Sequence, residues 1–380
     1  MPQSLLSALC AAALAAALAA APGPGDGEFV VAPPYAPDPA LSDQGNPRGA
    51  TFLVVLQTSA SSIFNGSDPT FAGTACDGPT PAECCHKAAP VDNRCAVNAQ
   101  RSVSVYVPPH YSDGDAAPVL VMQDGPSYFS QVSFALDNLG GAAPPGRSLP
   151  AFVAVSVQNG GCDAIGSERG LEYDTMSDRY ARFISEEVLP AVAADPALRA
   201  AFPRFAFSAD PDRRAAFGCS SGGAAALTMA YQRPDLFRRV AAYSATLVDQ
   251  QNHADETGAF AKFPLGAWSY HSGPQLLASS PPAAPLRIFH NANELDLGYN
   301  LSSAAINDKG FPGGTNNTAG DPGDWADEHH NWLVAGNRTA AALRSAGYRY
   351  RHVYALGAHH CDAAALLHTL GDTLVWLWGE

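Results

Sequence analysis

The chain has 380 residues with 22 basic and 36 acidic side chains, which gives a formal net charge of −14. Charged residues make up only 15% of the chain and hydrophobic residues 47%, so it can bury a large core and is not intrinsically disordered. The acidic balance, without any basic run, excludes nucleic acid and anionic membranes as expected partners. The length fits one large α/β domain or two ordinary domains.

The chain begins with an uncharged segment rich in Ala and Leu, residues 1–21. Its apolar run is too short for a transmembrane span and is typical of a secretory signal peptide, with small residues at 19–21 for cleavage. A retained N-terminal anchor is the alternative. No other segment approaches the length of a membrane helix, so we expect an exported protein, secreted or periplasmic, with no membrane span in the mature chain.

Seven of the eight cysteines follow this segment, and four of them crowd one stretch: Cys76, Cys84, Cys85 and Cys95. Export makes disulfides the expected state of these cysteines. The C-x7-C-C-x9-C spacing fits no common zinc pattern, so disulfides are favoured over a metal site.

Strand-like and helix-like segments alternate along the rest of the chain. Residues 22–48 are rich in Pro, Gly and Asp and predict an extended lead-in. Strands are predicted at residues 51–56, 101–107, 119–122, 152–157, 213–217, 240–244, 286–290 and 350–355. Helices are predicted at residues 177–193, 224–231, 332–346 and 362–377, the first capped by Ser177 and kinked or ended by Pro190. This alternation predicts an α/β fold with a mostly parallel sheet covered on both faces.

No linker divides the region after residue 48, so residues 49–380 are expected to form a single domain. Two insertions interrupt it: the Cys-rich stretch at about 70–97 and a Gly/Asn/Asp/Pro loop at about 302–328. A loop as long as the second is either a functional lid or a disordered insertion.

One motif carries chemistry: residues 218–222 read Gly-Cys-Ser-Ser-Gly, which matches G-x-S-x-G between a predicted strand and a predicted helix. A sharp strand-to-helix turn needs small residues around its nucleophile, because the backbone is strained and the helix packs closely. The turn would place Ser220 Oγ above the sheet near a helix N-terminus. A Gly-rich turn with an idle serine is the alternative.

A serine hydroxyl needs a base and an acid, which in this arrangement follow the nucleophile in the order Ser, acid, His at strand ends. After the strand at 286–290 the acid candidates are Glu294 and Asp296, and after the last strand the base candidates are His359 and His360. The remaining histidines considered are interpreted as structural or as weaker base candidates: His329, His330, His352 and His368.

From about Pro47 to the C-terminus, the chain resembles the enterochelin esterase-like branch of the putative esterase family, which are serine esterases with the α/β-hydrolase fold. The resemblance rests on the elbow at residues 218–223, on Glu294-Leu-Asp-Leu-Gly and His330-Asn-Trp, and on blocks at 101–108, 118–125, 166–175, 177–183 and 233–237. It implies a mostly parallel central sheet with helices on both faces.

The family pattern also assigns roles. Its acid block falls on Asp296, and its H-x-D block, sixteen residues before Trp376, falls on His360. The resemblance thus implies His360 over His359 as the base. An oxyanion hole is expected from the N–H of Ser221 and from the turn at Asp124 and Gly125. Arg169 and Glu172 are expected to form a supporting polar pair.

Cysteines flank both the nucleophile and the base, at Cys219 and Cys361. This arrangement resembles fungal tannases and some feruloyl esterases, in which a disulfide ties the elbow to the histidine loop. The resemblance implies a Cys219–Cys361 bridge, two buried free thiols being the alternative, and it leaves Cys162 as the odd cysteine.

The resemblance implies an exported serine esterase that hydrolyses carboxylic esters through a Ser220 acyl-enzyme. An acyltransferase with the same triad and a non-catalytic binding module on a hydrolase fold are the alternatives. The expected partner is a small-molecule ester, with siderophore, phenolic, acetylated-sugar and thioester substrates all open. No metal or organic cofactor is expected, and the sequence specifies no oligomeric state.

Overall fold

The computed structural model describes residues 25–66, 98–141, 143, 146–161, 168–249, 263, 265–298 and 328–379. Several sequence predictions therefore lie outside the described residues: the signal segment with Cys10, the four-cysteine cluster, Cys162, and the loop at 302–328 up to its last residue.

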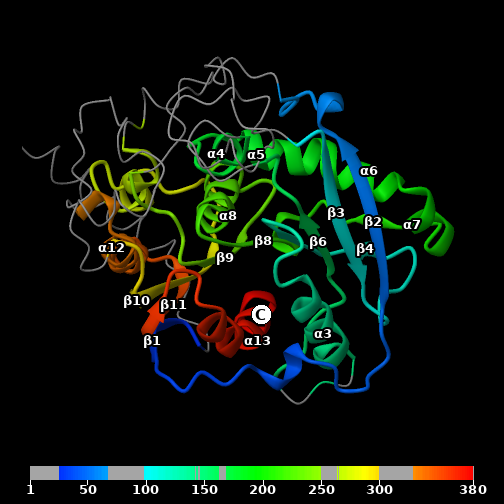
Figure 1. The fold of residues 1–380 in the computed structure, drawn as a ribbon, viewed down its shortest axis with the longest axis horizontal. Helices are drawn as coiled ribbons and strands as arrows, with labels where there is room; N and C mark the ends of the chain where they lie inside the picture. Colours follow the sequence, from blue (N-terminus) through cyan, green and yellow to red (C-terminus); the bar gives the residue numbers. More distant parts are fainter. Residues whose placement is uncertain are drawn as a thin grey trace, which may run out of the picture.

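Within the described residues, nine strands form one central sheet in the order β1-β11-β10-β9-β8-β5-β6-β3-β2 (Figure 1). The strands are β1 Gly27–Val31, β2 Ala50–Gln57, β3 Gln100–Val107, β5 Val119–Met122, β6 Val153–Val157, β8 Arg214–Cys219, β9 Arg239–Tyr243, β10 Arg287–Leu295 and β11 Arg349–His359. Neighbours from β1 to β6 pair in parallel, and β3 pairs antiparallel with both β6 and β2. A small second sheet pairs β4 Ala116–Ala117 with β7 Ala206–Phe207.

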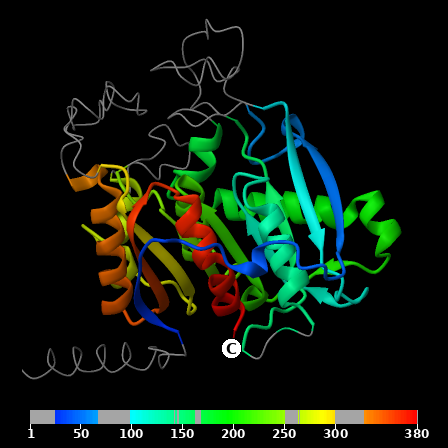
Figure 2. The same cartoon turned by 60° about the horizontal axis from the view of Figure 1, so that its bottom comes forward.

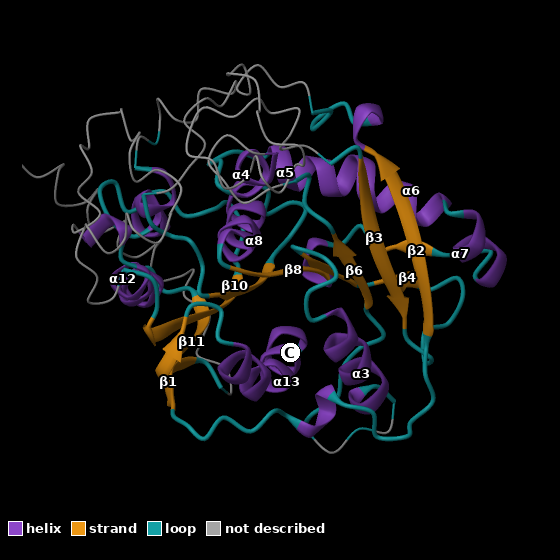
Figure 3. Cartoon of the chain, viewed as in Figure 1, coloured by secondary structure: helices purple, strands orange, loops and turns teal. Residues whose placement is uncertain are grey.

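Helices cover both faces of the sheet (Figures 1 and 3). On one face lie α3 Phe129–Leu139 and α13 Ala363–Trp378. The other face carries α4 Glu168–Tyr173, α5 Arg179–Arg182, α6 Leu189–Ala194, α7 Pro196–Ala201, α8 Ser221–Gln232, α10 Leu276–Ser279 and α12 Trp332–Ser345. Short 3-10 turns are η1 Pro39–Leu41, η2 Thr58–Ala60, η6 Pro211–Arg213, η7 Gly266–Tyr270 and η8 Glu328–His330. In the described part of the chain, no helix combines the length and hydrophobicity needed to cross a membrane.

The central strand β5 shows why the sheet needs two helical layers. All four of its residues are buried, with Val119 and Val121 in the core on the α8 face and Leu120 and Met122 in the core on the α13 face. A strand buried on both sides has a continuous apolar sequence, not an alternating one. The predicted α/β fold, with a mostly parallel sheet covered on both faces, is confirmed.

The helix predicted at 177–193 is not one regular helix. It begins at Arg179, and Ser177 Oγ only accepts a long hydrogen bond of 3.4 Å from Arg179 N. Its middle, η5 Phe183–Val188, is a π-helical turn that ends where Leu189 N donates to Ile184 O. Because Pro190 has no N–H for the usual bond, the wider turn before it lets the chain continue as α6. Pro190 therefore does not end the helical segment.

Strand β1 and helix α3 are two of the elements that were not predicted. The segment at 22–48 contributes β1, which pairs in parallel with β11 at the edge of the sheet and is seen beside α13 in Figure 2. Helix α3 is preceded by Tyr128 at its N-cap, whose backbone is left-handed (φ +56°) and whose side chain makes no capping bond. A helix without a capping residue leaves no start signal in the sequence.

Candidate active site

Ser220 occupies a strained turn between β8 and α8. Its backbone lies at φ +59° and ψ −132°, which places the hydroxyl at the N-terminus of α8. The glycines around it are required by space: a Cβ on Gly218 would lie 2.3 Å from the backbone of Gly222. Ser220 N donates to Tyr243 O at 3.1 Å, and Ser220 O accepts from Thr246 N at 3.0 Å. The neighbouring strand β9 and the loop after it therefore hold the turn in place.

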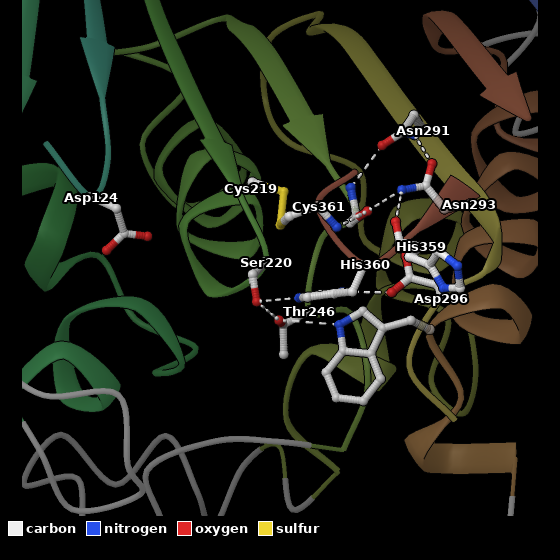
Figure 4. Close-up of a disulfide and its surroundings, with 12 residues drawn as sticks. Asp124, Cys219, Ser220, Thr246, Asn291, Asn293, Asp296, His359, His360 and Cys361 are labelled. Carbon is white, nitrogen blue, oxygen red and sulfur yellow. Dashed lines mark hydrogen bonds and ion pairs between the residues drawn. A yellow bond between two sulfur atoms is a disulfide. The ribbon is translucent and has the colours of Figure 1, made fainter. Parts of the chain in front are cut away.

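The structure brings Ser220, His360 and Asp296 into one hydrogen-bonded chain (Figure 4). His360 Nε2 lies 2.9 Å from Ser220 Oγ, and His360 Nδ1 lies 2.5 Å from Asp296 Oδ1. The Asp296 side chain is only 2% exposed and its Oδ1 also accepts from Leu297 N at 2.8 Å, whereas His360 is 21% exposed. A buried carboxylate on Nδ1 holds the proton there, which leaves Nε2 free to accept the serine proton.

The two alternative candidates, Glu294 and His359, do not take part in the hydrogen bonds that join Ser220, His360 and Asp296. Glu294 Oε2 accepts from Gly357 N at 2.7 Å. His359 has an exposed side chain, and its carbonyl accepts from Asn293 Nδ2 at 2.6 Å. The geometry therefore favours Asp296 over Glu294 as the acid and His360 over His359 as the base, a choice that the residues alone left open.

The histidine loop is tied to the elbow by a disulfide. Cys219 and Cys361 are bonded with their Cα atoms 6.0 Å apart, which confirms the predicted pairing. Since these cysteines directly precede Ser220 and follow His360, the bridge links Ser220 and His360 through their neighbours (Figure 4).

A buried hydrogen-bond network holds the same loop independently of the disulfide. Ser244 Oγ accepts from Cys361 N at 3.1 Å and from Asn293 Nδ2 at 2.8 Å. Asn293 also binds the carbonyl of His359 and accepts from Asn291 Nδ2 at 2.6 Å, while Asn291 Oδ1 accepts from Ser244 N at 2.7 Å. Backbone groups on both sides of His360 are thus held by side chains that are no more than 5% exposed.

The predicted oxyanion hole is only partly supported. Ser221 N–H, at the start of α8, makes no hydrogen bond to another residue that the structure describes. Gly125 N–H donates to Val157 O at 2.8 Å, so the prediction of Gly125 as a donor is wrong for this conformation. Asp124 N–H donates to Tyr173 Oη at 3.1 Å and reaches an oxyanion only if that contact is released. Burial holds the pKa of Tyr173 well above its ordinary value, so the hydroxyl stays protonated.

Asp124 carries a second set of contacts through its carboxylate. Arg169 Nε and Nη2 each lie 2.8 Å from one of its oxygens, and Asn159 Nδ2 donates to Oδ1 at 2.7 Å. Glu172 pairs instead with Arg101, in a buried site where burial raises the pKa of the carboxyl and Arg101 opposes the rise. Arg169 and Glu172 therefore serve two different ion pairs and do not pair with each other.

The four histidines that the sequence analysis set aside make contacts away from Ser220. His352 Nδ1 lies 3.2 Å from His290 Nδ1 inside the sheet, and burial lowers the pKa of both, that of His352 to about 4. His330 Nε2 donates to Asp249 O at 2.9 Å, and His368 Nδ1 to Ala36 O at 2.8 Å. His329 packs its ring against Trp268.

The residues around Ser220 and His360 that the sequence did not single out are Ser244, Thr246, Asn291, Asn293 and, in this role, Trp332. Their contacts join positions up to 117 residues apart, so no local motif marks them. Position is the one available signal, because Ser244 and Thr246 follow β9, Asn291 and Asn293 lie within β10, and Trp332 begins α12.

A mostly parallel sheet with Ser220 at a strand-to-helix elbow, hydrogen-bonded to a histidine and an acid that follow it in the chain, defines an α/β-hydrolase. A family model described as "Putative esterase" matches residues 95–360, which is more than half of the chain. The chain belongs to this family and is a serine hydrolase that acts on ester bonds. Among curated protein sequences, none matches it.

Three solved structures are similar to this chain. A ferulic acid esterase is 17% identical with a TM-score of 0.47, over 74% of this chain and 93% of that chain. Siderophore hydrolase EstA from Aspergillus nidulans is 18% identical with a TM-score of 0.44, over 73% of this chain and 88% of that chain. Enterobactin esterase FES from Shigella flexneri is also 18% identical at 0.44, over 73% of this chain and 55% of that chain.

Proposed function

We propose that the protein is an exported esterase that hydrolyses carboxylic esters through an acyl-enzyme on Ser220. The observation that carries this proposal is the chain of contacts from Ser220 Oγ through the His360 ring to the buried carboxylate of Asp296. An uncharged serine hydroxyl attacks an ester only if a base removes its proton, and His360 Nε2 lies within reach to do so.

In the first half of the reaction, Ser220 Oγ bonds to the ester carbonyl carbon as its proton passes to His360 Nε2. The negative charge that develops on the carbonyl oxygen is stabilised by Ser221 N–H and the dipole of α8. Collapse of this intermediate expels the alcohol, which takes the proton from His360. In the second half, His360 removes a proton from water, the hydroxide attacks the acyl carbon, and Ser220 regains the proton as the acid leaves.

Export is supported by the signal-like segment at residues 1–21 and by the disulfide beside the nucleophile, since disulfides persist in oxidising compartments. The proposal treats residues 49–380 as one domain, to whose sheet the lead-in at 22–48 adds strand β1.

The proposal is tested by hydrolysis of a panel of simple aryl and alkyl esters, with wild-type protein and Ser220→Ala. Wild-type turnover that falls to background in Ser220→Ala is expected. Ser130→Ala, an exposed serine on α3, is the matched control and is expected to keep wild-type turnover. Hydrolysis that survives Ser220→Ala would overturn the proposal. Product analysis with added alcohol decides the reaction: free acid as the main product supports hydrolysis, and a new ester would identify an acyltransferase.

A further inference from the structure

Thr246 contacts the nucleophile through both its backbone and its side chain. Its N–H donates to Ser220 O at 3.0 Å, and its Oγ1 lies 3.3 Å from Ser220 Oγ. The residue is 1% exposed, so its hydroxyl has lost access to bulk water. A buried hydroxyl is expected to use its hydrogen-bonding groups on protein partners.

The direction of these hydrogen bonds is fixed by the second partner of Thr246. Trp332 Nε1 lies 3.3 Å from Thr246 Oγ1, and an indole N–H can only donate. Thr246 Oγ1 therefore accepts from Trp332, which leaves its own hydrogen to donate. Among the described residues, the other hydrogen-bond partner of this hydroxyl is Ser220 Oγ.

On this geometry we propose that Thr246 is a further catalytic residue, whose hydroxyl donates a hydrogen bond to Ser220 Oγ. The inference rests on the proposed function, because it assigns a task only if Ser220 is the nucleophile. The Ser220 proton points to His360 Nε2, and one lone pair of Oγ accepts from Thr246. The remaining lone pair is thereby aimed at the ester carbonyl carbon, so the attacking atom is oriented before substrate binds.

Thr246 keeps its proton throughout the reaction. During acylation the new bond forms between Oγ and the carbonyl carbon, and the serine proton moves to His360. During deacylation Oγ becomes the leaving group, and the hydrogen bond from Thr246 stabilises the negative charge that develops on it. The same contact therefore assists both halves.

Trp332 acts as a positioning residue in this arrangement. Its N–H holds the Thr246 hydroxyl in the donating orientation, and its ring packs edge-on against the His360 ring, with centroids 5.8 Å apart and planes at 81°. The segment at the start of α12 thus contacts both partners of the nucleophile.

The test compares Thr246→Val, which replaces the hydroxyl by a methyl group of similar size, with Thr246→Ser, which keeps the hydroxyl. Thr246→Val is expected to lower kcat and kcat/KM together by about five- to tenfold with KM unchanged. Thr246→Ser is expected to stay within about twofold of wild type, a rescue that a purely packing role would not give. Wild-type rates in Thr246→Val, or an equal loss in Thr246→Ser, would overturn the inference.

Trp332→Phe provides the second variant, and it remains informative if Val at position 246 prevents folding. This substitution removes the N–H donor and frees the Thr246 hydroxyl to rotate, so kcat is expected to fall by about two- to fivefold. An unchanged kcat would overturn the proposal that Trp332 orients the Thr246 hydroxyl. The double variant with Thr246→Val is expected to be no slower than Thr246→Val alone, whereas losses that multiply would show independent roles. Ser220→Ala distinguishes failure of the proposed function from failure of the inference about Thr246. If Ser220→Ala remains active, the proposed function is refuted. If Ser220→Ala is inactive while Thr246→Val keeps wild-type activity, only the role of Thr246 is refuted.

Discussion

Removing the Cys219–Cys361 disulfide is expected to cost the protein stability more than activity. The perturbation is the double substitution Cys219→Ala and Cys361→Ala. A reductant would also act on the other cysteines, whereas this double substitution leaves them unchanged. The bridge joins positions 142 residues apart. In the loop-entropy treatment, a separation of 142 residues corresponds to about 5 kcal/mol of stabilisation at 25 °C. Because measured values are usually lower, we expect the free energy of unfolding to fall by about 2 to 5 kcal/mol.

Activity is expected to fall much less, because the hydrogen bonds that the backbone makes with Asn293 and Ser244 still hold it on both sides of His360. We expect kcat at 25 °C to remain within about tenfold of wild type, since one of several supports of a preorganised loop is lost. Urea denaturation followed by circular dichroism measures the first quantity, and ester hydrolysis by the folded protein measures the second. An unchanged urea midpoint would refute the stability argument. A loss in kcat of more than a hundredfold in folded protein would show that the hydrogen bonds do not hold the loop.

The remaining predictions concern the triad and the buried histidines. His360→Asn is expected to lower kcat/KM by about 10³- to 10⁴-fold, whereas His359→Asn, on an exposed side chain, changes it less than about twofold, and similar losses in both would contradict the assignment. Asp296→Asn is expected to lower kcat by a similar factor of about 10³ to 10⁴ through the wrong histidine tautomer, with Glu294→Gln as the near-neutral control measured in the same assay. Burial lowers the pKa of His352 to about 4. As pH falls below about 6.5, His352 therefore becomes protonated in the unfolded chain but stays neutral in the folded chain. The free energy of unfolding falls by up to about 1.4 kcal/mol per pH unit until about pH 4. His352→Gln is expected to make this acid dependence shallower in denaturation curves measured across that range, and an unchanged slope would count against it.

The strands of the central sheet could be predicted because burial on both faces leaves long apolar runs. Residues 119–122 and 153–157 have no polar interruption except Ser156, and they form β5 and β6 in the interior of the sheet. The candidate nucleophile, acid and base could be placed for a related reason. Each follows a predicted strand, and the carboxyl ends of parallel strands meet at one edge of the sheet.

Other features depend on contacts that no local pattern encodes. Helix α3 was missed because its first turn lacks a capping side chain. The sequence predicted the turn at Asp124 and Gly125 as part of an oxyanion hole. It could not show which N–H groups of this turn already donate hydrogen bonds, because their acceptors, Val157 and Tyr173, lie on other elements. The π-helical turn before Pro190 was not predicted either. It forms because Pro190 lacks an N–H while the apolar side chains of the turn stay buried.

The network around the histidine loop and the Thr246 hydroxyl belongs to the same group. Ser244 and Asn293 lie 49 residues apart, and Thr246 and Trp332 lie 86 residues apart. Single polar residues of these types are common beyond strand ends, so only the folded arrangement of β9, β10 and α12 shows that they converge on Ser220 and His360 (Figure 4).

The central claim is that Ser220 is the nucleophile, and covalent labelling tests it most directly. The protein is treated with a fluorophosphonate, and the modified residue is located by mass spectrometry of its peptides. The account predicts one phosphonyl adduct on Ser220, formed slowly in His360→Asn and absent in Ser220→Ala. Labelling of another residue, or an equal extent of labelling in Ser220→Ala, would contradict it.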